Sequence, residues 1–334
     1  IVTPIFGKEV NGQILSIGVG EFRIQPGEFA KFATALALAK VMERPTFDLS
    51  KRNYQAIAFG VLLVPIALIL LQPDTGTAMV YFSLLIMFYR EGLPQWYYGL
   101  GIGSVGITLL ALGVDNNLYL AAIIILVVGG LIYLGKKSWQ RILAFSMIGI
   151  GLIAYIYSID FVVSKLPIHQ QNRIMVLFNP DIDPLGVGWN VTQSKIAIGS
   201  GGFFGKGYLE GTQTKFDFVP EQDTDFIFCT LGEEFGWMGS FVVISLFAGL
   251  LYRLVIMAER QKTRFSRIYG YGVVSILLFH FMVNIAMTIG LFPVVGIPLP
   301  FFSYGGSSLW SFTVLLFIFI KLDSSRATQL GRIS

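Results

Sequence analysis

The chain has 334 residues, of which 54% are hydrophobic and only 13% charged, and its mean hydropathy is +0.69. This composition excludes an ordinary soluble enzyme, and repeated apolar runs of about 18 or more residues indicate a polytopic membrane protein. The net charge of +4 matters less than where the charges fall. The single cysteine, Cys229, excludes an intrachain disulfide and argues against redox chemistry.

The N-terminal stretch, residues 1–25, is polar and glycine-rich and lacks the apolar core of a cleavable signal peptide. Because the chain begins at Ile1 rather than at a methionine, we expect that upstream spans are missing.

The apolar runs predict an all-α polytopic membrane protein with about nine transmembrane helices and one long extracytoplasmic loop. The third and last runs are short, so we expect their ends to rest on protein or on polar turns. The predicted spans are 26–42, 54–71, 75–90, 95–113, 118–134, 142–164, 226–257, 268–291 and 307–321.

Lysine and arginine gather in alternate short connections, which predicts the orientation of the chain. The basic connections belong on the cytoplasmic side, with the C-terminus, and residues 1–25 lie outside. Residues 165–224 then form a 60-residue outside loop, far longer than a connector requires. Its glycines and apolar patches predict a folded, partly membrane-seated element, and long loops on a rigid scaffold commonly carry function.

The glycine-rich run "GSGGFFGKG" (199–207) is similar to a phosphate loop, but its residues do not match the phosphate-loop motif. A phosphate loop needs glycine at Ser200 and serine or threonine at Gly207, and no strand precedes it. Tight packing of backbone against backbone is the better interpretation.

Several polar residues have both a structural and a functional interpretation. Glu28 and Lys31 are three residues apart on one face of the first span, where they form either a structural ion pair or an interior polar site. Asp74 is most simply a helix N-cap. Asp225 is equally suited to capping and to catalysis, and the neighbouring acids Glu221 and Asp223 favour a general base.

Gly305 and Gly306 precede the last span, where they predict either a plain helix start or an anion site suited to a pyrophosphate. His280 and Asn284 are four residues apart on one helix face, and we expect interhelical hydrogen bonds from them. With His169, His280 is one of only two histidines, so an imidazole metal site is not expected, although carboxylates can hold a hard cation such as Mg²⁺.

Five motifs together resemble one protein family. They are "FNPDIDPLGVGWNVTQSKIAIGSGGFFGKGYLEGTQTKFDFVPEQDTDFIF", "GEEFG", "RIQPGEFAK", "QPDTGTA" and "PVVGIPLPFFSYGGSS". The pattern is similar to that of the SEDS family (shape, elongation, division, sporulation), from about residue 8 to residue 323. The "KIAIGSGG…GKG…GTQ" run favours its rod-shape-determining branch over its division branch.

The resemblance implies a peptidoglycan glycosyltransferase of the bacterial inner (cytoplasmic) membrane that polymerises lipid II on the outer face during cell elongation. The implied partners are lipid II, the nascent glycan strand, membrane lipid, the elongation machinery and a cross-linking class B penicillin-binding protein (a transpeptidase). No nucleic acid and no organic cofactor are implied, and a divalent cation (Mg²⁺ or Mn²⁺) is an open alternative. Residues 1–334 would form one SEDS membrane domain whose loop, 165–224, carries the catalytic region.

The family's essential aspartate falls at Asp225, as general base or as a metal ligand, and its paired cavity residues fall at Glu28 and Lys31. The other substrate-binding or cavity positions are Asp74, Arg173, Gln193, Ser194, Lys195, Glu221, Asp223, Ser303, Gly305 and Gly306. The chain departs from the family pattern at 95–134, where it has an additional helical pair.

Two other functions remain as alternatives. A lipid II flippase would use Glu28 and Lys31 as a passage, but it needs comparable polar features on both sides, whereas here the acids, the glycines and the long loop gather outside. A non-catalytic scaffold for the penicillin-binding protein would leave the acids around Asp225 unexplained. We expect Glu233 and Glu234, which lie further along the helix, to pack against interior cations.

Overall fold

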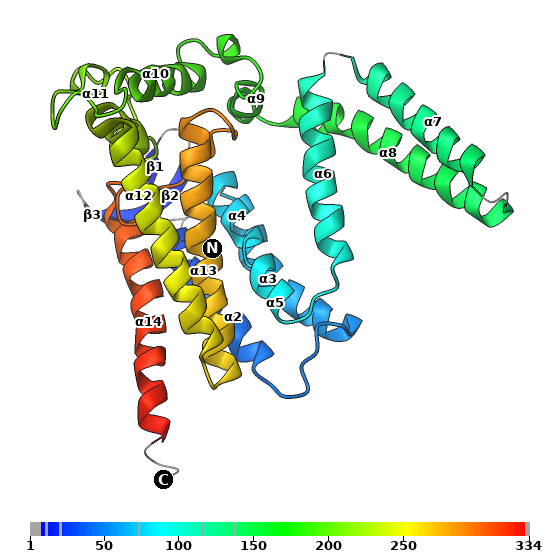
Figure 1. Cartoon of the computed structure of the whole chain (residues 1–334), viewed down its shortest axis with the longest axis horizontal. Helices are drawn as coiled ribbons and strands as arrows, with labels where there is room; N and C mark the ends of the chain where they lie inside the picture. Colours follow the sequence, from blue (N-terminus) through cyan, green and yellow to red (C-terminus); the bar gives the residue numbers. More distant parts are fainter. Residues whose placement is uncertain are drawn as a thin grey trace. The chain divides into compact units, whose positions relative to one another are not determined.

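The structure is a computed structural model that describes residues 8–10, 13–19, 22–72, 74–114, 116–135 and 138–330. The chain divides into two compact units, a first unit of residues 1–94 and 189–334 and a second unit of residues 95–188. Each unit is described by itself (Figure 1).

The first unit is a bundle of helices with a small antiparallel sheet ahead of it. The sheet joins strands β1 (Lys8–Val10), β2 (Gln13–Val19) and β3 (Phe22–Ile24) in that order. The helices are α2 (Pro26–Met42), α3 (Arg52–Leu70), α4 (Thr75–Phe82), α5 (Leu85–Arg90), α11 (Thr212–Lys215), α12 (Ile227–Glu259), α13 (Arg264–Thr288) and α14 (Gly306–Leu330), with most of α10 (Val187–Ser200).

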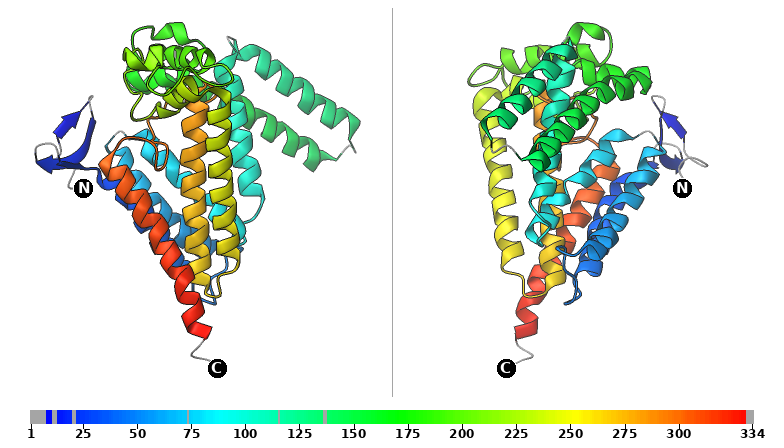
Figure 2. Two further views of the ribbon diagram at one scale, coloured as in Figure 1. Left: turned by 60° about the vertical axis from the view of Figure 1, so that its left-hand side comes forward. Right: turned by 90° about the vertical axis from the view of Figure 1, so that its right-hand side faces the viewer.

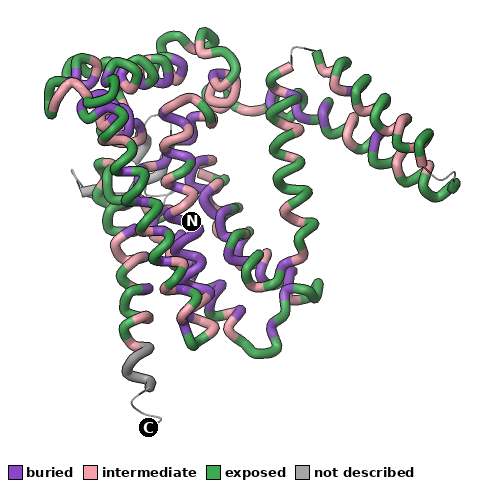
Figure 3. Tube along the Cα trace, in the orientation of Figure 1, coloured by how far each residue is buried: buried purple, intermediate pink, exposed green. Residues whose placement is uncertain are grey.

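Helix α13 lies at the centre of the first unit, in contact with α2, α4, α5, α12 and α14 (Figure 2). Over half of its apolar stretch is buried, against less than a third in each of the other six helices that are long and apolar enough to span a membrane. Buried residues recur along the helix from Ser266 to Thr288 (Figure 3). Thr263 begins α13 as its N-cap and accepts a hydrogen bond from the backbone N–H of Ser266.

The predicted helical membrane fold is confirmed. Seven helices within the described residues are long and apolar enough to cross a membrane. The predicted span 75–90 is two short helices, α4 and α5, because the chain turns at Ser83 and Leu84. The last helix, expected at 307–321, continues to Leu330. The first predicted span, α2, has 17 residues, and the total of nine crossings stays a prediction.

The second unit contains α6 (Trp96–Gly113), α7 (Asn117–Leu134), α8 (Trp139–Lys165), α9 (Ile168–Met175) and the short 3₁₀ helix η1 (Pro180–Ile182). Helix α8 packs against both α6 and α7, with a small core around Ala111, Ile156, Ile159 and Val163. Most side chains of α6 and α7 are exposed and apolar, which suits helices that face lipid.

The predicted long loop, 165–224, contains α9, η1, α10 and α11 with turns between them. Its glycine-rich run packs against α12, as the tight-packing interpretation predicted. A Cβ atom on Gly201 would lie 2.1 Å from the carbonyl oxygen of Gly232, and one on Gly205 would lie 2.0 Å from that of Glu234. Only residues without side chains allow so close an approach.

Helix α12 is interrupted where this run meets it. Gly236 has φ 64° and ψ −158°, a left-handed conformation that breaks the helical ladder. The backbone N–H groups of Trp237 and Met238 donate to the carbonyl oxygens of Gly202 and Phe203 instead. The loop therefore supplies hydrogen bonds that the helix itself cannot make at this point.

Candidate functional site

Asp225 lies in the turn immediately before α12. The helix begins at Ile227, and its N-cap residue is Phe226, which has no capping side chain, so Asp225 precedes the cap position. Its side chain is half-buried, and its backbone carbonyl oxygen accepts a 2.7 Å hydrogen bond from Nδ2 of Asn284. The backbone at Asp225 is thus fixed by α13 at the edge of the bundle.

The two other acids of this turn have different environments. The Glu221 carboxylate accepts a 2.8 Å hydrogen bond from the Thr224 hydroxyl, within the turn. Asp223 is exposed, and its carbonyl oxygen accepts a hydrogen bond of 2.8 Å from the backbone N–H of Tyr304. The turn is therefore tied to the segment that precedes α14.

Glu28 and Lys31 are both buried and form the predicted ion pair, with Lys31 Nζ 2.7 Å from Glu28 Oε2. The same Nζ lies 2.9 Å from Nε2 of His280 and 5.0 Å from the centre of the Phe312 ring. The opposite charges of the pair thus neutralise each other inside the bundle, and the Phe312 ring adds a favourable cation–π contact.

Asp74 is the N-cap of α4, as predicted, and accepts a 2.9 Å hydrogen bond from the backbone N–H of Thr77. Nε2 of Gln25 lies 3.5 Å from the other Asp74 carboxylate oxygen. Two residues further on, Gly76 packs directly on Val295, whose carbonyl oxygen would lie 2.2 Å from a Cβ. The start of α4 therefore meets the segment that joins α13 to α14.

That segment, residues 290–305, is compact and locally strained. Phe301 adopts a left-handed conformation with φ 65°, which is costly for a bulky residue. The Ser303 hydroxyl accepts a 2.7 Å hydrogen bond from the backbone N–H of Leu299 and so closes a turn. Gly305 and Gly306 follow, and α14 starts at Gly306. Strain of this kind is concentrated at functional sites.

Gln193, Ser194 and Lys195 lie on α10. The buried Ser194 hydroxyl donates a 2.8 Å hydrogen bond to the carbonyl oxygen of Thr288, at the end of α13. The Lys195 side chain passes over Gly290, where a Cβ would lie 2.4 Å from its Nζ. Gln193 is half-buried beside them in sequence. Helix α10 is thus fixed to the same end of α13 as the turn at Asp225.

Arg173 is the one predicted site residue of the second unit, where it lies half-buried on α9. Its place beside the other site residues therefore stays a prediction.

Glu233 has a larger role than its sequence suggested. Its carboxylate is fully buried and accepts hydrogen bonds from Lys206 Nζ at 2.7 Å and from the backbone N–H groups of Gln213 and Thr214 at 2.9 and 3.0 Å. The expected contact with a cation is confirmed for Glu233, whereas Glu234 makes no ion pair with a described residue. In the sequence, the only indication of this role is that two adjacent acids occur within an apolar run.

Among the described residues, no group of three or more His, Cys, Asp or Glu side chains is arranged to hold a metal ion. The residues around Asp225 therefore do not form a protein cage for Mg²⁺ or Mn²⁺. A cation there would need most of its ligands from substrate and water, as is common for Mg²⁺.

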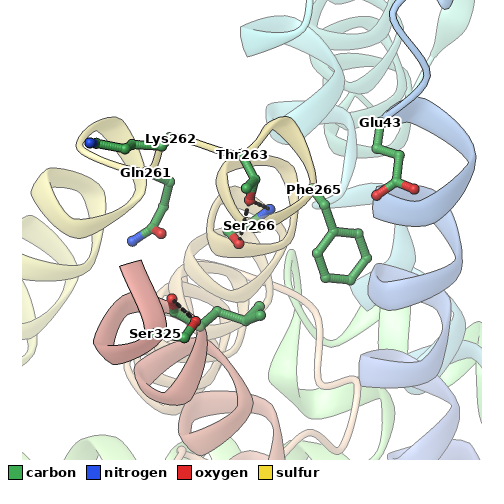
Figure 4. Close-up of a pocket in the computed structure, with 8 residues that line it drawn as sticks. Glu43, Gln261, Lys262, Thr263, Phe265, Ser266 and Ser325 are labelled. Carbon is green, nitrogen blue, oxygen red and sulfur yellow. Dashed lines mark hydrogen bonds between the residues drawn. The ribbon is translucent and has the colours of Figure 1, made fainter. Parts of the chain in front are cut away.

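A polar pocket of about 240 Å³ lies at the other end of α12 (Figure 4). Thr263 and Ser266, which line it, are joined by a 2.7 Å hydrogen bond between their hydroxyl groups. Asp225 precedes the first residue of α12 and the pocket follows its last, so the two lie at opposite ends of this helix. The pocket is lined by Glu43, Gln261, Lys262, Thr263, Phe265, Ser266, Leu322 and Ser325.

Solved structures share this fold. A chain of a peptidoglycan synthase complex, described as coordinating polymerization and crosslinking, is 25% identical with a TM-score of 0.65, and the match covers 97% of this chain and 77% of that one. The rod-shape-determining protein RodA of Thermus thermophilus is 24% identical with a TM-score of 0.57, over 97% of this chain and 74% of that one.

Curated relatives are similar over nearly the whole chain. The peptidoglycan glycosyltransferase RodA of Treponema pallidum (strain Nichols) is 35% identical over 97% of this chain and 80% of the relative. The peptidoglycan glycosyltransferase MrdB of Escherichia coli (strain K12) is 34% identical over 92% of this chain and 70% of the relative. The family model FtsW/RodA/SpoVE, described as cell cycle protein, matches residues 1–119 and 103–328. The chain therefore belongs to the FtsW/RodA/SpoVE family of membrane-embedded cell cycle proteins, as its SEDS motifs predicted.

Proposed function

We propose that this protein is a peptidoglycan glycosyltransferase that polymerises lipid II, with Asp225 as the general base. The names of its relatives support the reaction class. The observation that supports the residue is the position of Asp225, a half-buried residue of the turn before α12, where this turn meets the end of α13 and the 290–305 segment through hydrogen bonds to its backbone.

The proposed reaction is one inverting displacement. The Asp225 carboxylate takes the proton of the 4-hydroxyl of an acceptor N-acetylglucosamine while that oxygen bonds to the anomeric carbon of the donor sugar. The bond from this carbon to the pyrophosphate breaks, the electron pair leaves with undecaprenyl pyrophosphate, and an α-linked donor gives a β-1,4 linkage. Lys195, which is basic, and the start of α14 at Gly305 and Gly306 would offset the charge of the leaving group.

The glycan product implies the partners and the location. We propose that a class B penicillin-binding protein cross-links the strands, which agrees with the coordination of polymerization and crosslinking described for the related complex. The site would face the outside of the bacterial inner membrane, with the elongation machinery around it, and the C-terminus would be cytoplasmic.

The test is polymerisation of lipid II by purified protein, in which wild type is compared with Asp225→Asn. Removal of a general base commonly costs about 10²- to 10⁴-fold in rate, so we expect a loss of that size. Glu210→Gln, which changes an exposed acid of the same loop, is the matched control and should polymerise as wild type does. Normal polymerisation by Asp225→Asn would remove the catalytic assignment.

The flippase alternative is tested on the same preparation. Glu28 and Lys31 bind each other, and Lys31 also binds His280. These contacts do not favour a polar passage through the bundle. Proteoliposomes that move labelled lipid II across the bilayer while they form no glycan would support the flippase. Absence of both activities would instead indicate that a partner protein is required, and addition of a class B penicillin-binding protein would decide this.

The two roles considered for Asp225 differ in their response to metal. If Asp225 is the base, raising Mg²⁺ or Mn²⁺ cannot restore Asp225→Asn, because the amide does not take up the proton. If Asp225 is a ligand, more cation compensates for the weaker amide ligand. We expect no rescue over a wide range of cation concentration, measured as the initial rate of glycan synthesis.

A further inference from the structure

Two fully buried polar residues of α13, His280 and Asn284, have no part in the reaction described above. They are four residues apart, so they lie on one face of the helix. Polar side chains in the interior of a membrane protein are costly unless they are paired. Their hydrogen bonds show what each of them holds in place.

The contacts of His280 determine which ring nitrogen carries the hydrogen. The Lys31 ammonium, paired with Glu28, can only donate, so Nε2 of His280, 2.9 Å away, is the acceptor. The carbonyl oxygen of Pro298, 3.1 Å from Nδ1, can only accept, so Nδ1 carries the hydrogen and donates it. A neutral ring in this one tautomer satisfies both partners, and it links the buried ion pair to the 290–305 segment.

Asn284 links that segment to Asp225. Its Nδ2 group donates one hydrogen to the carbonyl oxygen of Ile297, at 2.8 Å, and the other to that of Asp225, at 2.7 Å. Oδ1 of Asn284 is buried without a partner in the described part of the chain. A flipped amide would point this oxygen at two carbonyl oxygens, so the observed orientation is the only favourable one.

Ile297 and Pro298 are neighbours, so the two side chains hold consecutive carbonyl groups of one segment. A continuous path of hydrogen bonds thus runs from Glu28 and Lys31 through His280, the 297–298 backbone and Asn284 to Asp225. The N–H of Tyr304, bonded to the carbonyl oxygen of Asp223, ties the same two segments a second time. The links from His280 and Asn284 onward end on backbone carbonyl groups, so none of them depends on the side chain of Asp225.

We propose that His280 and Asn284 are positioning residues that hold the backbone at Asp225 in register with the buried Glu28–Lys31 pair. The proposal rests on the proposed function in that Asp225 is the group positioned. It explains why two polar side chains occupy the most buried apolar helix, and it makes the placement of the general base depend on the ion pair.

Substitutions at Asn284 and at His280 test the contacts of each residue separately. Asn284→Ala removes both hydrogen bonds to the carbonyl groups. His280→Ala removes the contacts with Lys31 and Pro298, whereas His280→Asn keeps an amide donor near the position of Nδ1 and can still bond Pro298. Ser275→Ala is the matched control, because Ser275 is a fully buried polar residue of α13 that bonds only within its own helix, to the carbonyl oxygen of Tyr271.

The first readout is hydrogen exchange of the turn 221–226 in the full-length protein, without substrate. We expect faster exchange in Asn284→Ala and His280→Ala, nearly wild-type exchange in His280→Asn, and no change in Ser275→Ala. Unchanged exchange of this turn in Asn284→Ala would overturn the proposal. If Asn284→Ala does not fold, the His280→Ala and His280→Asn pair decides, since equal exchange in the two would contradict the proposed path.

The second readout is lipid II polymerisation. We expect kcat of Asn284→Ala to fall roughly 100-fold, since a misplacement of about 1 Å can cost that much, while KM changes little. A rise of KM with an unchanged kcat would contradict a positioning role. If the wild type itself does not polymerise lipid II, the proposed function fails, and the exchange data still decide whether these residues hold the turn.

Discussion

At the scale of single residues, the buried carboxylate of Glu233 holds several parts of the loop in place and has no part in the proposed reaction. It accepts hydrogen bonds from one lysine and two backbone N–H groups. These bonds fix the "GTQ" turn (211–213) and, through Lys206, the end of the glycine-rich run. A carboxylate satisfied in this way stabilises its partners, and its loss leaves several buried donors unpaired.

We expect Glu233→Gln to destabilise the 206–215 segment locally by about 2 to 3 kcal/mol, because hydrogen bonds to charged groups are worth roughly 1.5 to 3 kcal/mol. Hydrogen exchange of Gln213 and Thr214 measures this free energy directly. Glu234→Gln, at the next position, is the control and should leave their exchange unchanged. A double-mutant cycle with Lys206→Met isolates the ion pair, and zero coupling would show that the backbone bonds dominate.

At the scale of elements, the glycine-rich run packs backbone against backbone on α12. We expect Gly201→Ala to lower the melting temperature and to slow polymerisation, because its Cβ would lie 2.1 Å from the carbonyl oxygen of Gly232 and the two segments would have to separate. Gly199→Ala is the control, since nothing lies within 4 Å of a Cβ there and alanine favours the helix.

Thermal unfolding in detergent gives the first comparison, and glycan synthesis gives the second. Equal melting temperatures for Gly201→Ala and Gly199→Ala would mean that the glycine-rich run can move away from α12 without loss of stability. The packing of the two segments would then have no part in stability.

The helices could be predicted from the sequence because each apolar run is local and long. The ends of α2, α6 and α7 agree with the predicted spans within two residues. The kink at Gly236 could not be predicted, because the hydrogen bonds that replace the helical ones come from Gly202 and Phe203. The break between α4 and α5 falls within an apolar run, with no glycine or proline at the break to mark it. At the site, the Glu28–Lys31 pair follows from helical spacing, whereas the bond of Lys31 to His280 joins residues 249 positions apart. No local pattern contains that information.

At the scale of the whole molecule, several basic residues at one end of the first unit are paired with acids. Arg90 binds Glu259 with two hydrogen bonds, and Arg264 and Arg267 share Glu91. The turn between α12 and α13 belongs to this end, and the glycine-rich run belongs to the start of α12. One helix therefore separates the proposed site from the basic end.

The orientation can be tested with single cysteines in a Cys229→Ser background. Tyr208 and Lys262 are both exposed, one in the long loop and the other after α12. We expect a membrane-impermeant maleimide to label Tyr208→Cys in intact cells and Lys262→Cys only after permeabilisation, because the basic connections belong inside. The reverse labelling would place the proposed active site on the cytoplasmic side.

The interruption of α12 at Gly236 has a consequence for biogenesis. A spanning helix normally completes its own backbone hydrogen bonds before it meets any neighbour. Here the N–H groups of Trp237 and Met238 are completed by Gly202 and Phe203, which are synthesised 35 residues earlier. The nascent α12 therefore completes these backbone hydrogen bonds only when it packs against this earlier segment, so insertion of the span and folding of the loop are coupled.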